Sequence, residues 1–138
     1  MEGDKAMTDR QLIEIARTAQ GNSYSPYSGF PVGAAIECDD GTVFTGCNVE
    51  NASFGATICA ESAAIVSAVS AGYTRFKRIA VCSNGSNYCM PCGMCRQRML
   101  EFSPKMEVLC VREDGRYVSY PLSGLMPNPF GADQIEKV

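Results

Sequence analysis

The chain contains no histidine among its 138 residues. Histidine is the side chain used most often for proton transfer near neutral pH, and it is also the commonest metal ligand. Any metal site or proton relay in this protein must therefore use other groups. Its eight cysteines and 15 acidic residues are the available candidates.

Long apolar runs and clusters of basic residues are missing as well. No stretch of about 18 apolar residues could cross a bilayer, and the charged start, Met1–Lys5, leads into no apolar core of a signal peptide. The 12 basic and 15 acidic residues give a net charge of -3, with no Lys/Arg run that could neutralise a row of phosphates. We therefore expect a cytoplasmic protein with neither a nucleic-acid nor a membrane partner.

Such a reducing compartment disfavours disulfides among the eight cysteines and favours metal ligation or simple burial. Four of them lie in apolar runs that read as strands, and we expect these to be small buried hydrophobic side chains: Cys38, Cys47, Cys82 and Cys110. Cys89 lies near a Cys-x-x-Cys pair but outside its spacing, so we expect a bystander thiol.

The length and the 46% hydrophobic content suit one domain with a sizeable core. Apolar spacing predicts helices from a capping box at Thr8 up to Gly21 and over residues 58–72, 91–102 and 122–126. Strands are predicted over residues 32–38, 42–49, 78–83, 106–111 and 117–120, and an ordered loop over residues 22–31. Alternating strands and helices indicate an α/β domain with a mixed sheet covered by helices.

Two short segments carry the chemistry: Cys59-Ala60-Glu61 and Pro91-Cys92-Gly93-Met94-Cys95. Cys92 and Cys95 are three residues apart in the first turn of a predicted helix, so both thiols can bind one ion. Cys59 lies in the first turn of another predicted helix. If the two helix N-termini converge, their partial positive charge favours thiolates over thiols. The sequence therefore predicts Cys59, Cys92 and Cys95 as metal ligands.

Glu61 follows Cys59 by two residues, a spacing at which side chains on a helix do not face each other. We expect Glu61 to stand beside an open coordination position instead of occupying one. Three protein ligands and a water are the pattern of a catalytic zinc site. A neighbouring carboxylate can carry a proton from that water to a substrate nitrogen, a contribution of about 10²- to 10⁴-fold in rate.

A Cys-x-x-Cys pair alone would favour a thioredoxin-like redox pair or a structural metal site. Here the pair follows a proline, and a Cys-x-Glu motif lies at the start of another helix about thirty residues upstream. This combination is the signature of the zinc deaminases, with cysteine in place of the usual histidine. It favours a hydrolytic zinc site.

The match extends over most of residues 8–131. The segments that carry it are residues 25–35 (SPYSGFPVGAA), 44–55 (FTGCNVENASFG), 58–61 (ICAE), 91–97 (PCGMCRQ) and 125–131 (LMPNPFG). Together they resemble the cytidine deaminases, and the three cysteines in a short chain resemble the homotetrameric class. The resemblance implies a single domain over residues 1–138 with a mixed five-stranded sheet in a three-layer α/β/α fold. It also implies one Zn²⁺ per chain and hydrolysis of cytidine and 2'-deoxycytidine to uridine and 2'-deoxyuridine with release of ammonia, as in pyrimidine salvage.

The resemblance also assigns roles to individual positions. Glu61 would be the catalytic proton carrier, and the backbone of Ala60 would read the pyrimidine edge with it. Phe30 would pack against the nucleoside, Asn48 and Glu50 would hydrogen-bond the ribose, and Tyr27 would line the pocket. Phe54 and Phe130 match positions that can reach a neighbouring subunit's site.

Each substrate position also has a structural interpretation. Phe30 could be ordinary loop packing and Phe130 a C-terminal core anchor. Asn48 and Glu50 alternate with apolar neighbours and could form a solvated strand face. A deaminase of modified nucleosides and a zinc-stabilised binding or redox module stay open as alternatives, whereas the charge disfavours a nucleic-acid editing deaminase.

Two positions depart from the family pattern. Ser62 stands where tetrameric members commonly have an arginine that can hydrogen-bond the thiolates. Three thiolates on Zn²⁺ leave a net charge of about -1, and we hypothesise that Arg96 supplies part of the missing positive potential. Met90 stands where a small polar residue is common, so the family pattern does not define the exit route of ammonia here.

Overall fold

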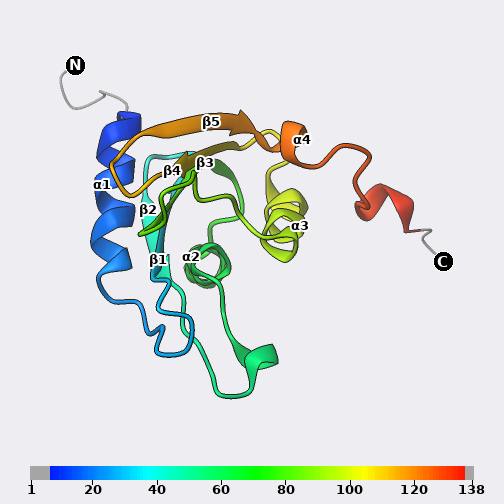
Figure 1. The fold of residues 1–138 in the computed structure, drawn as a ribbon. Helices are drawn as coiled ribbons and strands as arrows, with labels where there is room; N and C mark the ends of the chain where they lie inside the picture. The colour runs from blue at the N-terminus through cyan, green and yellow to red at the C-terminus, as the bar shows by residue number, and fades with distance from the viewer. Residues whose placement is uncertain (1–6, 136–138) are drawn as a thin grey trace.

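The computed structural model describes residues 7–135, so the charged start Met1–Lys5 lies outside the described part of the chain. Five strands form one mixed sheet in the order β2-β1-β3-β4-β5 (Figure 1). Their bounds are Val32–Cys38 (β1), Val43–Cys47 (β2), Phe76–Ser83 (β3), Glu107–Val111 (β4) and Tyr117–Pro121 (β5). Strands β3 and β4 pair parallel, and the other neighbours pair antiparallel. The predicted mixed five-stranded sheet is confirmed.

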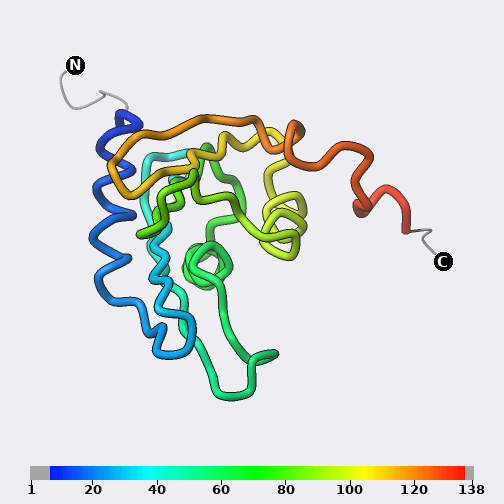
Figure 2. Tube along the Cα trace, viewed as in Figure 1, coloured from blue at the N-terminus to red at the C-terminus, as the bar shows by residue number. Residues whose placement is uncertain are grey.

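The helices cover both faces of this sheet. They are α1 (Asp9–Gln20), α2 (Ala60–Ser70), α3 (Gly93–Phe102) and the short α4 (Leu122–Leu125), with 3-10 turns η2 (Phe54–Ala56) and η3 (Ala132–Gln134). Helix α1 lies on one face, and α2 and α3 lie side by side on the other (Figure 1). The chain trace shows that the segment after α4 leads away from the sheet (Figure 2). None of the helices in residues 7–135 has the length and apolar character needed to cross a membrane.

Helix α1 begins at the predicted capping box. The Thr8 hydroxyl accepts from the Gln11 backbone N–H at 3.1 Å, and the Gln11 side chain accepts from the Thr8 N–H at 2.9 Å. The apolar side of the helix packs on the sheet in a cluster of buried residues: Leu12, Ile13, Ala16, Ala35, Ala80, Cys82, Leu109 and Val111. This packing fixes α1 on the face opposite α2 and α3.

Helix α2 lies very close to strand β2, and a strand glycine makes this possible. A Cβ atom on Gly46 would be 2.4 Å from the Ala60 carbonyl oxygen and 2.5 Å from the Ala64 nitrogen. Contacts this short leave no room for a side chain. The start of α2 is therefore seated directly on the strand.

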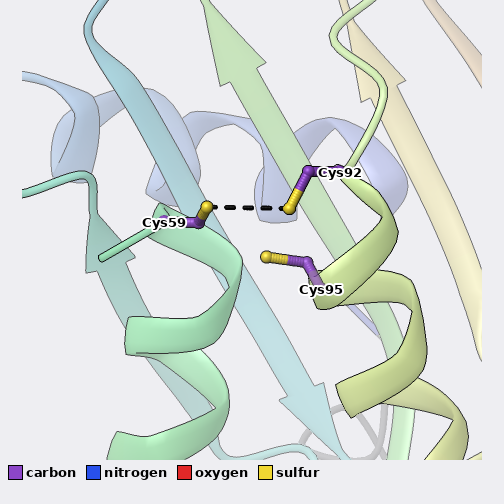
Figure 3. A group of neighbouring side chains, drawn as sticks. All are labelled: Cys59, Cys92 and Cys95. Atoms are coloured by element: carbon purple, nitrogen blue, oxygen red, sulfur yellow. Dashed lines mark hydrogen bonds between the residues drawn. The ribbon is translucent and has the colours of Figure 1, made fainter. Parts of the chain in front are cut away.

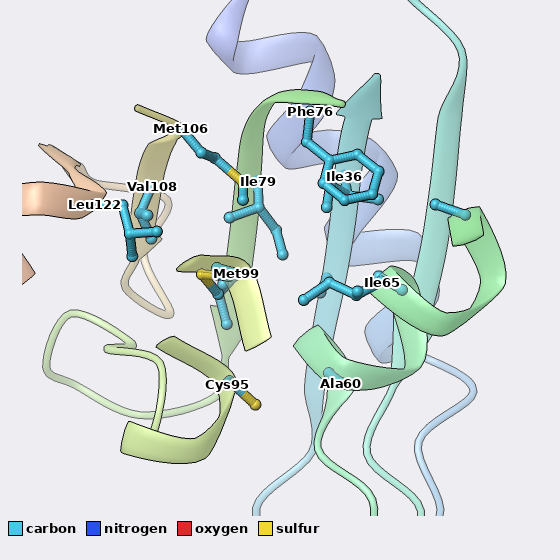
Figure 4. Close-up of a cluster of buried hydrophobic side chains, with 14 of the residues drawn as sticks. Ile36, Ala60, Ile65, Phe76, Ile79, Cys95, Met99, Met106, Val108 and Leu122 are labelled. Carbon is cyan, nitrogen blue, oxygen red and sulfur yellow. The ribbon is translucent and has the colours of Figure 1, made fainter. Parts of the chain in front are cut away.

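The larger core cluster fills the space between the sheet, α2 and α3 (Figure 4). Its members labelled there are Ile36, Ala60, Ile65, Phe76, Ile79, Cys95, Met99, Met106, Val108 and Leu122. Ala60 and Cys95, one from each of the two motifs, belong to this cluster. The chemistry-bearing segments are therefore anchored in the core.

The predicted boundaries of strand β1 are confirmed, whereas several others differ by one or two residues; strand β3, for example, begins at Phe76 and not at residue 78. Strand β2 ends at Cys47 and not at residue 49, because Val49 leaves the sheet to make bridges with Tyr24 and Ile58. That bridge keeps Ile58 extended, so α2 begins at Ala60. Helix α3 likewise begins at residue 93, two residues after the predicted start.

Candidate active site

The N-termini of α2 and α3 meet on one face of the sheet. Cys59 is the N-cap residue of α2 and Cys92 is the N-cap residue of α3, while Cys95 lies in the first turn of α3. Cys59 and Cys92 thus immediately precede the helices in which they were expected. The N–H groups at a helix start give it a partial positive charge, which favours thiolates at this position. The predicted convergence of the two helix starts is confirmed.

The three sulfur atoms point toward one another (Figure 3). They lie within 4.8 Å of one another, and the Cys59 and Cys92 Sγ atoms are 3.7 Å apart. Zinc bonded tetrahedrally to sulfur at about 2.3 Å places its sulfur ligands about 3.8 Å apart. A disulfide would require about 2.0 Å, and all eight cysteines are free. The donor set and its spacing therefore fit one zinc ion.

Two of these thiols affect each other's pKa. The pKa of Cys59 is lowered, with its interaction with Cys95 as the largest cause, and the pKa of Cys95 is raised, with its interaction with Cys59 as the largest cause. Since zinc binds thiolates, metal uptake must release the protons that the thiols carry.

Glu61 stands in the wall of a pocket of about 230 Å³ in front of the thiols. Its side chain is 5% exposed, and burial raises the pKa of the carboxyl group. The remaining lining residues are Phe30, Val32, Asn48, Thr57, Cys59, Ala60, Cys89, Met90 and Cys92. Within residues 7–135, the candidate metal group consists of the cysteine triad, Cys59, Cys92 and Cys95, and does not include Glu61. A raised pKa beside a metal site suits a residue that carries protons near neutral pH.

Asn48 is buried at the edge of this pocket. Its Nδ2 donates to the Phe30 carbonyl oxygen at 2.9 Å, and its Oδ1 accepts from the Val32 N–H at 2.9 Å and from the Ser23 hydroxyl. Asn48 therefore fixes the loop that carries Phe30. The interpretation of Asn48 as part of a solvated strand face is wrong.

Glu50 is also buried, and it holds the same loop at another point. Its carboxylate accepts from the Tyr27 and Ser28 N–H groups, each at 3.0 Å, and from the Ser28 hydroxyl. These hydrogen bonds, with the Ser28 hydroxyl first, lower the pKa of Glu50. Glu50 lines a second pocket, of about 340 Å³, which shares Thr57 with the first.

The predicted aromatic positions fall in different places. Phe30 lines the thiol pocket, whereas Tyr27 and Phe54 line the second pocket with their ring centroids 6.1 Å apart. Phe130 is 58% exposed and lies in the segment after α4. A core anchor would be buried, so that interpretation of Phe130 is wrong.

Arg96 donates to the carbonyl oxygens of Pro91 at 2.8 Å and Leu125 at 3.0 Å. The charged group linked to a thiol is instead Arg98, which donates to the Ser62 hydroxyl 3.1 Å from the Cys95 sulfur. Arg98 could not be identified from the sequence, because a contact across 36 residues leaves no trace in local spacing.

Cys89 and Met90 both line the thiol pocket. Cys89 stands outside the metal group, as predicted, and burial raises the pKa of its thiol to about 11. Of the four cysteines expected in strands, Cys38, Cys82 and Cys110 are buried and Cys47 is half-buried.

Comparisons with known proteins agree with this geometry. The family model for the cytidine and deoxycytidylate deaminase zinc-binding region matches residues 6–111. A probable cytidine deaminase of Dictyostelium discoideum is 42% identical over 126 residues, which cover 91% of this chain and 85% of that protein. A cytidine deaminase of Sporosarcina psychrophila is 38% identical over 130 residues, which cover 94% of this chain and 96% of that protein.

Solved structures give the same relationship. The crystal structure of cytidine deaminase from Burkholderia pseudomallei superimposes with a TM-score of 0.87 at 45% sequence identity, covering 90% of this chain and 100% of that one. The fold and the thiol cluster thus define an α/β protein with a zinc site of the deaminase type. The chain belongs to the cytidine and deoxycytidylate deaminase family.

Proposed function

We propose that this protein hydrolyses cytidine and 2'-deoxycytidine to uridine and 2'-deoxyuridine with release of ammonia, a reaction of pyrimidine salvage. The observation that carries the proposal is the meeting of three thiols from two helix N-termini at a pocket walled by the buried Glu61. Family membership supports the same zinc-dependent reaction.

Cys59, Cys92 and Cys95 would hold one Zn²⁺ per chain. Bound there, zinc would supply the Lewis acidity that makes water a nucleophile near neutral pH. Three protein ligands are the donor set of a catalytic zinc site, whereas a closed structural site would use four, and within residues 7–135 the candidate group has three.

Glu61 would carry the protons. Its carboxylate would accept one proton from the attacking water and deliver it to N3 of cytosine as the water oxygen bonds to C4. It would then take the remaining proton from the new C4 hydroxyl group and pass it to the amino group, which leaves as ammonia when the C4–N bond breaks. Burial raises the pKa of this carboxyl, which makes it a stronger base and keeps it able to give the proton back. The backbone of Ala60, the neighbouring lining residue, would read the pyrimidine edge.

The nucleoside would lie against Phe30, with its ribose toward Asn48 and Glu50. The Asn48 amide donates one N–H to Phe30 and retains a second. The Glu50 carboxylate accepts three hydrogen bonds from the loop, and a carboxylate has about four acceptor sites. Each group therefore retains one site for a sugar hydroxyl while it fixes the loop.

Residues 1–138 would form one catalytic domain, and four copies of the chain would assemble into a homotetramer. The protein would act in the cytoplasm, without a nucleic-acid or membrane partner. Phe54 and Phe130 would reach the site of a neighbouring copy, and Tyr27 would line the pocket entrance. The exposure of Phe54 and Phe130 supports this role, since large apolar side chains in water are suited to an interface.

The test is a direct assay. Purified protein is added to cytidine, deoxycytidine and their 5'-monophosphates, cytosine absorbance and ammonia are followed, and zinc per chain is measured. We expect turnover of both nucleosides and one zinc per chain. Zinc without turnover would contradict the proposal and favour a binding module, and turnover confined to monophosphates would contradict the nucleoside assignment.

A further inference from the structure

Ser62 lies between a proposed zinc ligand and a positive charge. It is buried in the first turn of α2, with 4% of its surface exposed. Its Oγ is 3.1 Å from the Cys95 sulfur and 2.8 Å from Nη1 of Arg98. Since Cys95 and Arg98 both belong to α3, the hydroxyl of one helix joins two residues of the other.

The chemistry of the three groups fixes the direction of both hydrogen bonds. A guanidinium can only donate, so Arg98 donates to the Ser62 oxygen. A serine hydroxyl has a single proton, which then remains for the Cys95 sulfur. A thiolate can only accept. The geometry therefore forms a one-way chain from Arg98 through Ser62 to Cys95.

This series of hydrogen bonds ends at the most deeply buried of the three sulfurs. Cys95 is 0% exposed, so water cannot solvate its negative charge as it can at the exposed Cys92. Among the side chains of residues 7–135, Ser62 provides the one N–H or O–H donor hydrogen-bonded to a sulfur of the triad. Three thiolates on Zn²⁺ carry a net charge of about -1, and the Ser62 bond directs positive potential toward it.

We propose that Ser62 and Arg98 are positioning residues of the metal site, which act as a relay that orients the Cys95 sulfur and compensates its charge. The inference rests on the proposed zinc site. Outer partners of metal ligands typically contribute about 10- to 100-fold in metal affinity. Arg98 is exposed, so its charge alone is screened by water, and its effect must pass through the Ser62 hydroxyl.

A double-mutant cycle on zinc affinity tests the relay. The dissociation constant of zinc is measured by competition with a chromophoric chelator for wild type, Ser62→Ala, Arg98→Met and the double variant. We expect about tenfold weaker binding for Ser62→Ala and about two- to fivefold for Arg98→Met, the range for an exposed charge contact. In the Ser62→Ala background, Arg98→Met should have no further effect, because its route to the sulfur is gone.

Two further variants serve as controls. Ser67→Ala makes the same change at an exposed position of α2 and should leave zinc affinity unchanged. Arg98→Lys keeps a charged donor and should retain most of the affinity that Arg98→Met loses. Alanine is the best helix former, so Ser62→Ala is compatible with α2.

Cobalt substitution gives a readout that helix stability does not change. A hydrogen bond lowers the energy of the thiolate electrons, so the sulfur-to-cobalt charge-transfer band should move to lower energy in Ser62→Ala and stay in place in Ser67→Ala. The relay would be overturned if Ser62→Ala bound zinc within twofold of wild type, or if Arg98→Met had the same effect in both backgrounds. Turnover and zinc content of the wild type would still test the proposed function separately. A wild type without zinc would overturn the metal site and the relay together.

Discussion

Glu61 is the residue that should separate metal binding from turnover. It lines the thiol pocket but is not part of the cysteine triad. Glu61→Gln keeps the size of the side chain and removes its ability to accept a proton, so we expect zinc content to be unchanged and kcat to fall by at least about 10²- to 10⁴-fold. Ammonia release at saturating cytidine, with zinc analysis of the same sample, measures both.

The matched control is Glu101→Gln, an exposed glutamate on α3. It should behave as wild type in both assays. A Glu61→Gln variant with wild-type kcat would remove Glu61 from the proton transfers.

Glu50 should make stability depend on pH. Hydrogen bonds to the ionised carboxylate lower its pKa below the ordinary value of 4.5. A lowered pKa means that the stabilisation is present above the ordinary value and is lost as the pH falls through the folded-state pKa. The stability advantage of wild type over Glu50→Gln should therefore be larger at about pH 6 than at about pH 4.

Urea unfolding midpoints at the two pH values check this. Glu14→Gln, an exposed glutamate on α1, is the control and should show no such pH-dependent difference. An advantage of wild type over Glu50→Gln that stays constant between the two pH values would contradict the assignment.

At the residue scale, the site residues that could be predicted are those that short local motifs in the sequence identify. Cys59, Cys92 and Cys95 were found because two short motifs place thiols at helix starts. The Ser62–Arg98 contact and the loop-holding bonds of Asn48 were not found, because they depend on how distant segments pack. Arg96 was hypothesised from its position next to Cys95, but its guanidinium turns to two backbone carbonyls.

At the element scale, the close approach of α2 to β2 should control the metal site. A Cβ on Gly46 would overlap the first turn of α2. Gly46→Ala must push the N-terminus of α2, and Cys59 with it, away from the sheet. We expect a loss of about 1–3 kcal/mol of unfolding free energy, the usual cost of overpacking, and weaker zinc binding.

Gly55→Ala is the matched control, because a Cβ there meets nothing within 4 Å. Urea unfolding and chelator competition on both variants give the comparison. Equal stability and zinc affinity of Gly46→Ala and wild type would show that α2 does not depend on this contact.

Element types were predictable from apolar period and capping residues, as the capping box of α1 and the bounds of β1 show. Element ends were less so. The bridge of Val49 to Ile58 keeps the chain extended up to Cys59, and such a bridge has no periodic pattern in the sequence.

At the scale of the whole molecule, the mixed α/β class followed from alternating elements. The strand order β2-β1-β3-β4-β5 did not, because it is set by which buried faces pack together. That order is what brings the starts of α2 and α3 to the same face (Figure 1).

The proposed tetramer predicts that chains complement one another. If Phe130 completes a neighbour's site, Glu61→Gln and Phe130→Ala should each have low activity alone. Mixed tetramers contain sites with an intact Glu61 from one chain and an intact Phe130 from its neighbour. Mixing the variants and allowing subunit exchange should therefore raise cytidine turnover above the sum of the parents, with sedimentation reporting the assembly. Strictly additive activity would contradict a shared site.

In the proposed site, three sulfurs would share one zinc ion whose remaining ligand is a water beside Glu61. Zinc K-edge X-ray absorption on the purified protein measures this ligand set directly. We expect three sulfur ligands at about 2.3 Å and one oxygen at about 2.0 Å. Four sulfur ligands, or fewer than three, would contradict it.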